Sequence, residues 1–211
     1  QDNTWRVTCE NGAGESQTFD GGTLVSTIPL NETALMLSPA PPRDVLDSAK
    51  ALDFLSLVVL YIITEKDSIL ECQYEYSLGN SYNRISDMNK FSPETSPPGQ
   101  NMLAVEFSSL HGDEVWTSTK EDLLERCLGA LETEGIVRRD EVLKLLLVRT
   151  RHAYPMYKLG YKKHLERVKE YLASVPNMHF TGRVGEFMYM DSDQCLTRSF
   201  SLAKRIAEDR A

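Results

Sequence analysis

The sequence is poor in the residue patterns that build metal sites and disulfide frameworks. Its four cysteines, Cys9, Cys72, Cys127 and Cys195, are widely scattered with no CxxC pair, and its four histidines show no metal-like spacing. We therefore expect neither a metal site nor a disulfide framework. Free thiols are typical of a reducing compartment, so the cytoplasm is the predicted location.

Long apolar runs and excess positive charge are also lacking. The longest largely apolar run, Leu55 to Ile63, is too short to cross a bilayer, so no membrane span is expected. The net charge of −8 argues against a general nucleic-acid-binding surface. No signal peptide is visible at Gln1, and strand-like alternation already begins at Trp5 without a starting methionine. We expect a fragment or a processed chain.

A dinucleotide-binding fingerprint is a third absence. Gly12-x-Gly14 is followed by no third glycine at the right place, and no helix pattern opens there. Asn11–Gly14 instead predicts a hairpin turn between Trp5–Cys9 and Thr18–Phe19. No Ser–His–Asp set is evident either, so nucleophilic catalysis of that kind is not expected.

The remaining composition is that of an ordinary globular protein. The 211 residues, 41% hydrophobic and 26% charged, suffice for one sizeable domain or two small ones. We expect an α/β or α+β fold with a mixed, largely antiparallel sheet. Its predicted strands are Phe54–Thr64, Leu70–Tyr76, Met102–Phe107 and a buried strand within Val142–His152. Helices at Ser118–Glu134 and Tyr161–Ala173 are expected to pack against this sheet.

Local signals place the ends of several elements. Ser118–Glu121 is interpreted as a capping box, with Gly135 ending the helix that follows. Pro42 suits the first turn of a short helix. Asn80–Gln100 is rich in proline, serine and asparagine and predicts a loop. Gly22–Leu30 predicts a buried strand that proline ends.

The stretch best suited to bind a ligand runs from Gly182 to Asp193. Met178–Thr181 predicts a buried strand before it, and Gly182 and Gly185 bracket Arg183 while allowing close backbone approach. An amphipathic helix follows, with Ser192 or Asp193 as its N-cap and with an apolar face of Leu196, Phe200, Ala203 and Ala207. Strand, glycine turn and helix N-terminus suit phosphates or the polar edges of a cofactor. A tight structural turn is the alternative.

The spacing of this stretch resembles a known family. Gly-Arg-x-Gly-x-aromatic-x-Tyr-x-Asp-x-Asp before a helix of small residues is similar to the C-terminal signature of UDP-galactopyranose mutases and of related flavin amine-oxidase and protoporphyrinogen-oxidase-like proteins. Three further motifs follow the family's order: the strand ending at Ile28-Pro29, the Tyr82–Ile85 loop, and Ala153–Tyr157 with Gly160-Tyr161. The resemblance covers almost the whole chain, but only the C-terminal half of such a flavoprotein.

The resemblance implies the C-terminal part of a GR2-type FAD-dependent oxidoreductase fold that lacks the N-terminal Rossmann segment. It implies FAD as the cofactor of the intact parent protein, with weak or absent binding by this chain alone. The implied cofactor-binding residues are Gly182, Arg183, Gly185, Asp191, Ser192 and Asp193. The implied substrate-binding residues are Arg84, Tyr154, Tyr157 and Tyr189, and the catalytic residues stay unassigned. Arg84 suits a substrate diphosphate, and a solvated loop arginine is the alternative.

The same resemblance divides the chain into three parts. Residues 1–33 would be strands left from the FAD-binding domain, 34–176 the substrate-binding domain, and 177–211 the last strand, the Gly-Arg turn and the return helix. The first strands and the last segment should then meet, with Val25 or Ile28 near Met178–Thr181.

Two functions of different classes are compatible with these features. One is the substrate- and flavin-contacting half of an FAD-dependent oxidoreductase or of a sugar-nucleotide mutase. Phe187 stands where a mutase tyrosine aligns, which favours the broader relatives over true mutases. The other is a non-catalytic binding domain that retains the half-fold. We expect a small-molecule substrate, with a nucleotide sugar among the candidates, and leave a homo-oligomer open.

Overall fold

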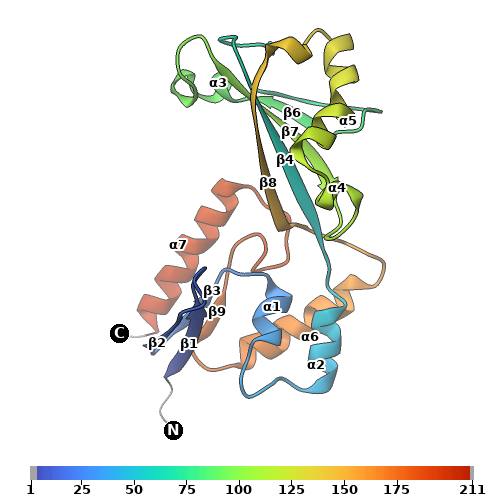
Figure 1. Cartoon of the computed structure of the whole chain (residues 1–211). Coiled ribbons are helices and arrows are strands. Elements are labelled where there is room, and N and C mark those ends of the chain that lie inside the picture. The colour runs from blue at the N-terminus through green and yellow to red at the C-terminus, as the bar shows by residue number, and fades with distance from the viewer. Residues whose placement is uncertain (1–3, 210–211) are drawn as a thin grey trace. The chain divides into compact units, whose positions relative to one another are not determined.

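The computed structural model describes residues 4–209, which form two compact units. The chain up to Asp53 and the chain from Tyr154 onward make the first unit, and Phe54–Ala153 make the second. Figure 1 shows the elements of both. None of the helices in the described part of the chain has the length and apolar character needed to cross a membrane.

The first unit contains two small sheets. Strands β1 (Trp5–Glu10) and β2 (Ser16–Gly21) form the predicted antiparallel hairpin. Strands β3 (Leu24–Ser26) and β9 (Met178–Phe180) pair in parallel, with Val25 opposite His179. The prediction that Val25 lies near Met178–Thr181 is therefore confirmed. The strand expected over Gly22–Leu30 is shorter than predicted, because Pro29 is already the N-cap of the next helix.

Four helices complete the first unit. They are α1 (Leu30–Leu35), α2 (Arg43–Lys50), α6 (Tyr161–Ser174) and α7 (Ser192–Glu208). Helix α6 buries Val168 and Leu172 and packs on α1, α2 and β9, so the prediction that it packs against the large sheet is wrong. Its apolar stripe predicts a buried face but does not identify the partner, because helices and sheets offer similar apolar surfaces.

The second unit is built on a five-stranded sheet in the order β5-β6-β7-β4-β8. The strands are β4 (Phe54–Thr64), β5 (Tyr74–Tyr76), β6 (Arg84–Asp87), β7 (Asn101–Ser109) and β8 (Val142–Pro155). The pairs β4–β7, β5–β6 and β6–β7 are antiparallel. The predicted fold class, a largely antiparallel sheet with flanking helices, is thus confirmed.

The core of this unit lies on one face of β4. Residues of β4 alternate strictly between buried and half-buried, and Val58, Leu60 and Ile62 point to the buried side. Helix α5 (Lys120–Thr133) covers that side with an apolar stripe that includes Cys127. Burial raises the pKa of the Cys127 thiol to about 12, so this thiol is a packing group rather than a nucleophile.

Three segments of this unit differ from the prediction. The strand predicted over Leu70–Tyr76 is limited to Tyr74–Tyr76. The N–H of Leu70 donates to the carboxylate of Asp87 instead of to a neighbouring strand. Within the predicted loop, β6 is followed by α3 (Met88–Phe91) and the 3-10 turn η1 (Pro93–Thr95). Strand β8 lies at the sheet edge and is mostly exposed rather than buried.

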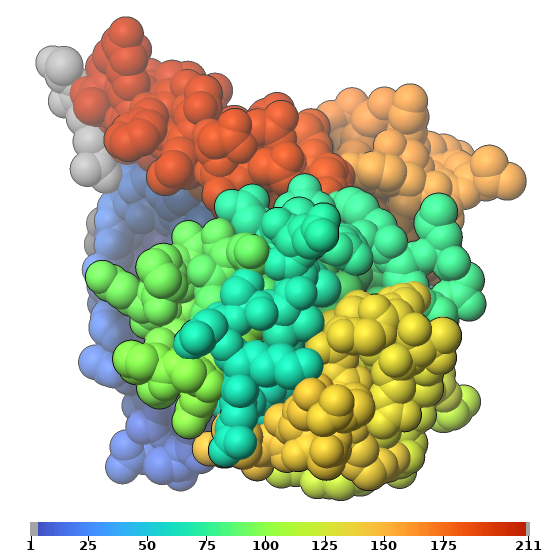
Figure 2. Space-filling model, turned by 90° about the horizontal axis from the view of Figure 1, so that it is seen from above, coloured from blue at the N-terminus to red at the C-terminus, as the bar shows by residue number. Residues whose placement is uncertain are grey.

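Asp87 explains how the long loop before β5 is held. Burial alone would raise the pKa of its carboxyl, but hydrogen bonds from the backbone of Ile69 and Leu70 outweigh burial and hold that pKa below its ordinary value. Earlier in the same loop, Lys66 forms an ion pair with Glu141. Figure 2 shows this segment in turquoise at the surface, between the green and yellow segments on either side.

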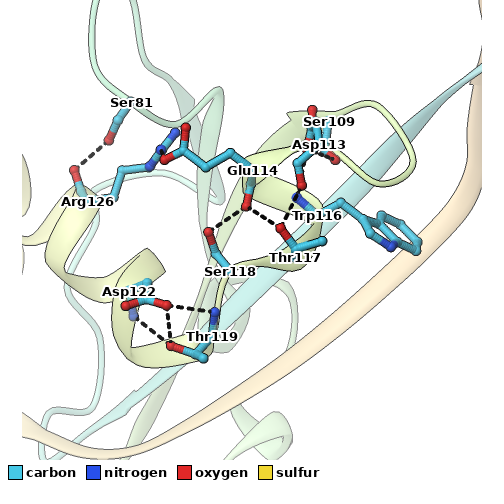
Figure 3. A network of polar contacts seen from close by, with 10 residues as sticks. All are labelled: Ser81, Ser109, Asp113, Glu114, Trp116, Thr117, Ser118, Thr119, Asp122 and Arg126. Atoms are coloured by element: carbon cyan, nitrogen blue, oxygen red, sulfur yellow. Dashed lines mark hydrogen bonds and ion pairs between the residues drawn. The ribbon is translucent and has the colours of Figure 1, made fainter.

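The start of α5 differs from the sequence interpretation by one residue. Thr119 is the N-cap, and it forms a capping box with Asp122 rather than Ser118 with Glu121. Ser118 instead caps the preceding helix α4 (Glu114–Thr117), and its hydroxyl donates to the carbonyl of Glu114 (Figure 3). Two consecutive helices therefore use adjacent residues as C-cap and N-cap, which a single-helix pattern does not reveal.

Candidate functional site

The glycine turn follows β9 directly, and its two glycines have different roles. Gly182 has φ of +88°, a left-handed conformation that favours glycine, and a side chain there would meet open space. Gly185 has no such room, because a Cβ would lie 2.3 Å from the carbonyl oxygen of Thr181. The turn therefore has open space beside Gly182 and none beside Gly185. Gly185 serves the packing of the turn against β3 and β9.

Arg183 is held in place by a carbonyl and by two aromatic rings. Its Nε donates to the carbonyl oxygen of Met190 at 2.7 Å. Its guanidinium lies 5.3 Å from the ring centre of Tyr154 and 5.2 Å from that of Tyr189. A terminal nitrogen stands 3.7 Å from a carboxylate oxygen of Asp191. Such cation–π contacts fix the direction of a guanidinium while leaving part of it accessible.

An aromatic cluster lies beside this arginine, and Tyr154 and Tyr189 are its two rings in contact with the guanidinium. The cluster consists of Tyr154, Tyr157, Tyr161, Phe187 and Tyr189. Tyr154 stacks on Tyr189 with 5.8 Å between ring centres, and Tyr157 stacks on Tyr161 at 4.8 Å. The backbone N–H of Tyr189 donates to the hydroxyl of Tyr157 at 2.7 Å. The aromatic cluster therefore joins the Tyr-Pro motif to the glycine turn.

Phe187 anchors the aromatic cluster. Its φ is +51°, which is uncommon for a residue with a large side chain. The ring is only 1% exposed and lies 6.2–6.3 Å from the rings of Tyr157 and Tyr161. Burial of the ring offsets the strained backbone, which is a pattern often found at binding sites.

Most of the predicted site residues of the first unit lie together. The structure gathers Gly182, Arg183, Tyr154, Tyr157, Tyr189 and Asp191. Ser192 and Asp193 are exposed in the first turn of α7. Sequence reasoning did not assign Tyr161 to the site, although the aromatic residue in Gly160-Tyr161 was a usable signal.

The start and the apolar face of α7 differ from the prediction. Asp191 is the N-cap, not Ser192 or Asp193, and its N–H donates to the side chain of Gln194. Of the predicted apolar face, Leu196 is 59% exposed and Phe200 is 74% exposed. Helical spacing identifies these residues as one face, but burial depends on what packs there.

Arg84 belongs to the second unit and lies on strand β6 instead of in a loop. Its Nε and one terminal nitrogen donate to the same carboxylate oxygen of Glu106, at 3.0 Å and 2.5 Å. The guanidinium also lies 5.3 Å from the ring centre of Tyr74 and 5.9 Å from that of Tyr76. Its charge is thus already matched by an adjacent carboxylate on β7.

The residues of the first unit fit part of a flavin better than a phosphate. Tyr157 and Tyr189 are half exposed, and Tyr189 offers an aromatic ring beside the Arg183 cation. Asp191 and Asp193 add negative charge at the first turn of α7, which disfavours a phosphate there and suits hydroxyl donors. The described residues include no group of three or more metal-binding side chains.

A hollow of about 800 Å³ also lies in the first unit, beside β9 and α7. Its lining includes Thr181 and Glu186 but none of the aromatic cluster. Glu186 is bound on this side by Arg198, at 2.6 Å. The hollow and the aromatic cluster are therefore separate features.

The family model "Flavin containing amine oxidoreductase" matches residues 1–183. None of the curated protein sequences compared with the chain matches it. The match covers the Tyr-Pro motif and reaches Arg183, while α7 lies beyond it.

Solved structures show a similar fold. A reduced UDP-galactopyranose mutase shares 20% identity over 86% of this chain and 39% of its own, with a TM-score of 0.68. A protein assigned as a protoporphyrinogen oxidase from an Exiguobacterium species shares 19% identity over 87% of this chain and 40% of its own, with a TM-score of 0.61. A putrescine oxidase variant shares 14% identity over 90% of this chain and 44% of its own, with a TM-score of 0.63. The chain thus spans about two fifths of these structures, and the likeness at these identities concerns the fold alone.

Proposed function

Because the chain belongs to the flavin containing amine oxidoreductase family, we propose that it is the C-terminal, flavin- and substrate-contacting portion of an FAD-dependent oxidoreductase or sugar-nucleotide mutase. The observation that carries this proposal is the fixed guanidinium of Arg183 beside the stacked rings of Tyr154 and Tyr189, next to the open Gly182 turn. A cation and flat aromatic faces at one place match the needs of a flavin ring and of a substrate lying on it.

In this proposal the flavin, when bound, supplies the hydride or nucleophilic chemistry, and the chain supplies position and electrostatics. Arg183 stabilises negative charge that develops at the flavin or on the substrate, because its direction is set before the reaction. Tyr154 and Tyr189 orient the bound molecule and exclude water. Gly182, with the first turn of α7, contacts the hydroxyl-bearing part of FAD next to the flavin ring.

In this proposal, different parts of the chain contact FAD and substrate. We assign FAD contact to residues 1–33 and 177–211, and substrate contact to residues 34–176. Within the latter, the compact unit Phe54–Ala153 presents a sheet whose strand β6 carries Arg84.

The test is Arg183→Lys in the longest reading frame that contains this chain, compared with Arg167→Lys. Arg167 is a matched control, because it forms an exposed ion pair with Asp44 in the same unit. Lysine keeps the charge but loses the planar fork. A flavin-contacting Arg183 predicts about tenfold weaker substrate affinity or flavin reactivity with little change in melting temperature, while Arg167→Lys stays near wild type.

A purely structural Arg183 predicts the reverse. The variant would then lose roughly 1–3 kcal/mol of stability, the range for a broken buried hydrogen-bond set, with unchanged kinetics. That result would overturn the flavin-contacting role of Arg183, whereas the absence of any flavin-dependent turnover in the wild-type protein would support the alternative of a non-catalytic binding domain.

A further inference from the structure

A small group of polar side chains lies inside the core of the second unit, at the end of the sheet where β4 stops and β7 starts. Thr64, Asp87 and Asn101 are 0% exposed there. Thr64 is paired with Asn101 across β4 and β7. Asp87 is paired with Leu103, which points to the same face of β7 as Asn101 because side chains alternate along a strand. Asn89 joins them, since its N–H donates to Asp87 at 3.1 Å. We call Thr64, Asp87, Asn89 and Asn101 the polar end of the core.

Several atoms of the polar end of the core have no hydrogen-bond partner among residues 4–209. They are the Oγ1 of Thr64, the Oδ1 of Asn89, and both the Oδ1 and the Nδ2 of Asn101, and all are buried. A buried polar atom without a partner has lost its hydrogen bonds to water and gained none in return. Native cores leave few such atoms, so four at one end of one sheet indicate a shared partner.

The carboxylate of Asp87 is not that shared partner. Its Oδ2 accepts three hydrogen bonds, from the hydroxyl of Ser68 and from the N–H groups of Ile69 and Leu70. Burial tends to raise the pKa of this carboxyl, and the amide of Asn101 is among the groups that hold the pKa below its ordinary value. The amide therefore faces the carboxylate, but the two do not meet in hydrogen-bonding geometry.

The chemistry of the unpaired atoms decides what the shared partner is. The amide of Asn101 offers a donor and an acceptor whichever way it is turned, Asn89 offers an acceptor, and the hydroxyl of Thr64 can do either. A water molecule both donates and accepts, and internal waters make about three such bonds. A cation would suit the oxygens but not the NH2 group of Asn101, and an anion would be repelled by the carboxylate of Asp87. Water alone satisfies the whole set.

The pairing of the two strands brings the unpaired atoms within reach of one water. Side chains directly opposite each other in an antiparallel pair have Cβ atoms about 4.5–5.5 Å apart. Thr64 and Asn101 are such a pair. A single oxygen atom between their polar ends can therefore bond to both.

We propose that the polar end of the core binds one internal water molecule, which bridges Thr64 and Asn101 and also bonds to Asn89. None of these residues belongs to the candidate functional site. The inference therefore goes beyond the proposed function, and either can fail while the other holds.

The water has a structural task in the second unit. The N–H groups of Ile69 and Leu70 donate to Asp87, and Leu70 is a buried member of the core. By fixing the amide of Asn101 beside Asp87, the water helps to hold the loop that follows β4. It thereby helps to close this end of the core.

A crystal structure of the full chain tests the site directly. We expect one density peak within hydrogen-bond distance of the Thr64 hydroxyl and the Asn101 amide, and the same peak in crystals grown without sodium or potassium salts. In solution, oxygen-17 relaxation dispersion counts the waters that stay bound for long times. The double variant Thr64→Val with Asn101→Leu should lose one of these waters, because both bridged groups become apolar at similar volume.

Thr33→Val is the matched control. It makes the same exchange at another buried threonine, whose hydroxyl already has a protein partner in Ser26 at 2.7 Å. Its number of long-lived waters should equal that of the wild type. The N–H of Leu70 should exchange with solvent at least about tenfold faster in the double variant than in this control, because the loop then opens more often. Circular dichroism melts check that each variant is folded.

Three results would overturn the inference. One is a crystal structure in which the Thr64 hydroxyl bonds directly to the amide of Asn101, with no water between them. Another is an equal number of long-lived waters in the double variant and in Thr33→Val. The third is a melting temperature that rises with sodium chloride but not with choline chloride, and only when Thr64 and Asn101 are present, because a cation would then occupy the site. The wild-type crystal structure decides the question even where the double variant does not fold.

Discussion

Single residues decide how the glycine turn is built. Gly185 and Gly182 look alike in sequence, but only Gly185 lies against a carbonyl, and only Gly182 needs a left-handed backbone. For Arg183, the sequence leaves open a ligand contact or a place in a tight structural turn. The structure shows the bond to Met190 together with the two ring contacts.

Gly185→Ala should therefore destabilise the first unit. The new methyl group would overlap the carbonyl of Thr181, and such overpacking costs about 1–3 kcal/mol. Gly22→Ala is the control, because a side chain there meets nothing within 4 Å, and it should cost less than about 0.5 kcal/mol. Urea unfolding measures both. An equal loss of unfolding free energy in the two variants would show that the turn shifts to make room for the methyl group at position 185.

At the scale of elements, capping depends on the neighbouring helix. Ser118 is engaged at the end of α4, so Thr119 begins α5. Figure 3 shows Ser118 in contact with Glu114 and the neighbouring Thr119 in contact with Asp122. The sequence interpretation took Ser118 as the cap, since it considered a single helix.

Thr119→Ala should lower the free energy of unfolding by about 1 kcal/mol, the usual value of a lost N-cap. Ser118→Ala should lower it by less than about 0.5 kcal/mol, because Ser118 ends a helix of only four residues and its hydroxyl satisfies no N-terminal N–H group. Thermal melts of the two variants under the same conditions compare them. A larger loss for Ser118→Ala would restore the assignment made from sequence.

For the whole molecule, FAD binding depends on how much of the flavoprotein fold this chain contains. The chain spans about two fifths of the similar structures, and its sequence holds no GxGxxG turn for a pyrophosphate. The aromatic cluster offers contacts to a flavin ring but no cradle for the rest of FAD.

We therefore predict that the purified chain binds FAD weakly or not at all. Flavin absorbance after dialysis against FAD measures the bound fraction, and lumiflavin serves as a control that lacks the phosphates. FAD should bind no more tightly than lumiflavin. A yellow protein with stoichiometric FAD would contradict the prediction.

The sequence by itself determined the elements whose signals are local. The alternation of β4, the apolar stripe of α5, the hairpin turn and the Gly-Arg turn all follow from spacing within short windows. Tertiary structure alone decided what each face meets, because its partners lie far away along the chain. It placed α6 on α1 and α2, left Leu196 exposed, and set Glu106 beside Arg84 across 22 residues. Periodicity defines a buried face, whereas its partner depends on contacts that no local pattern encodes.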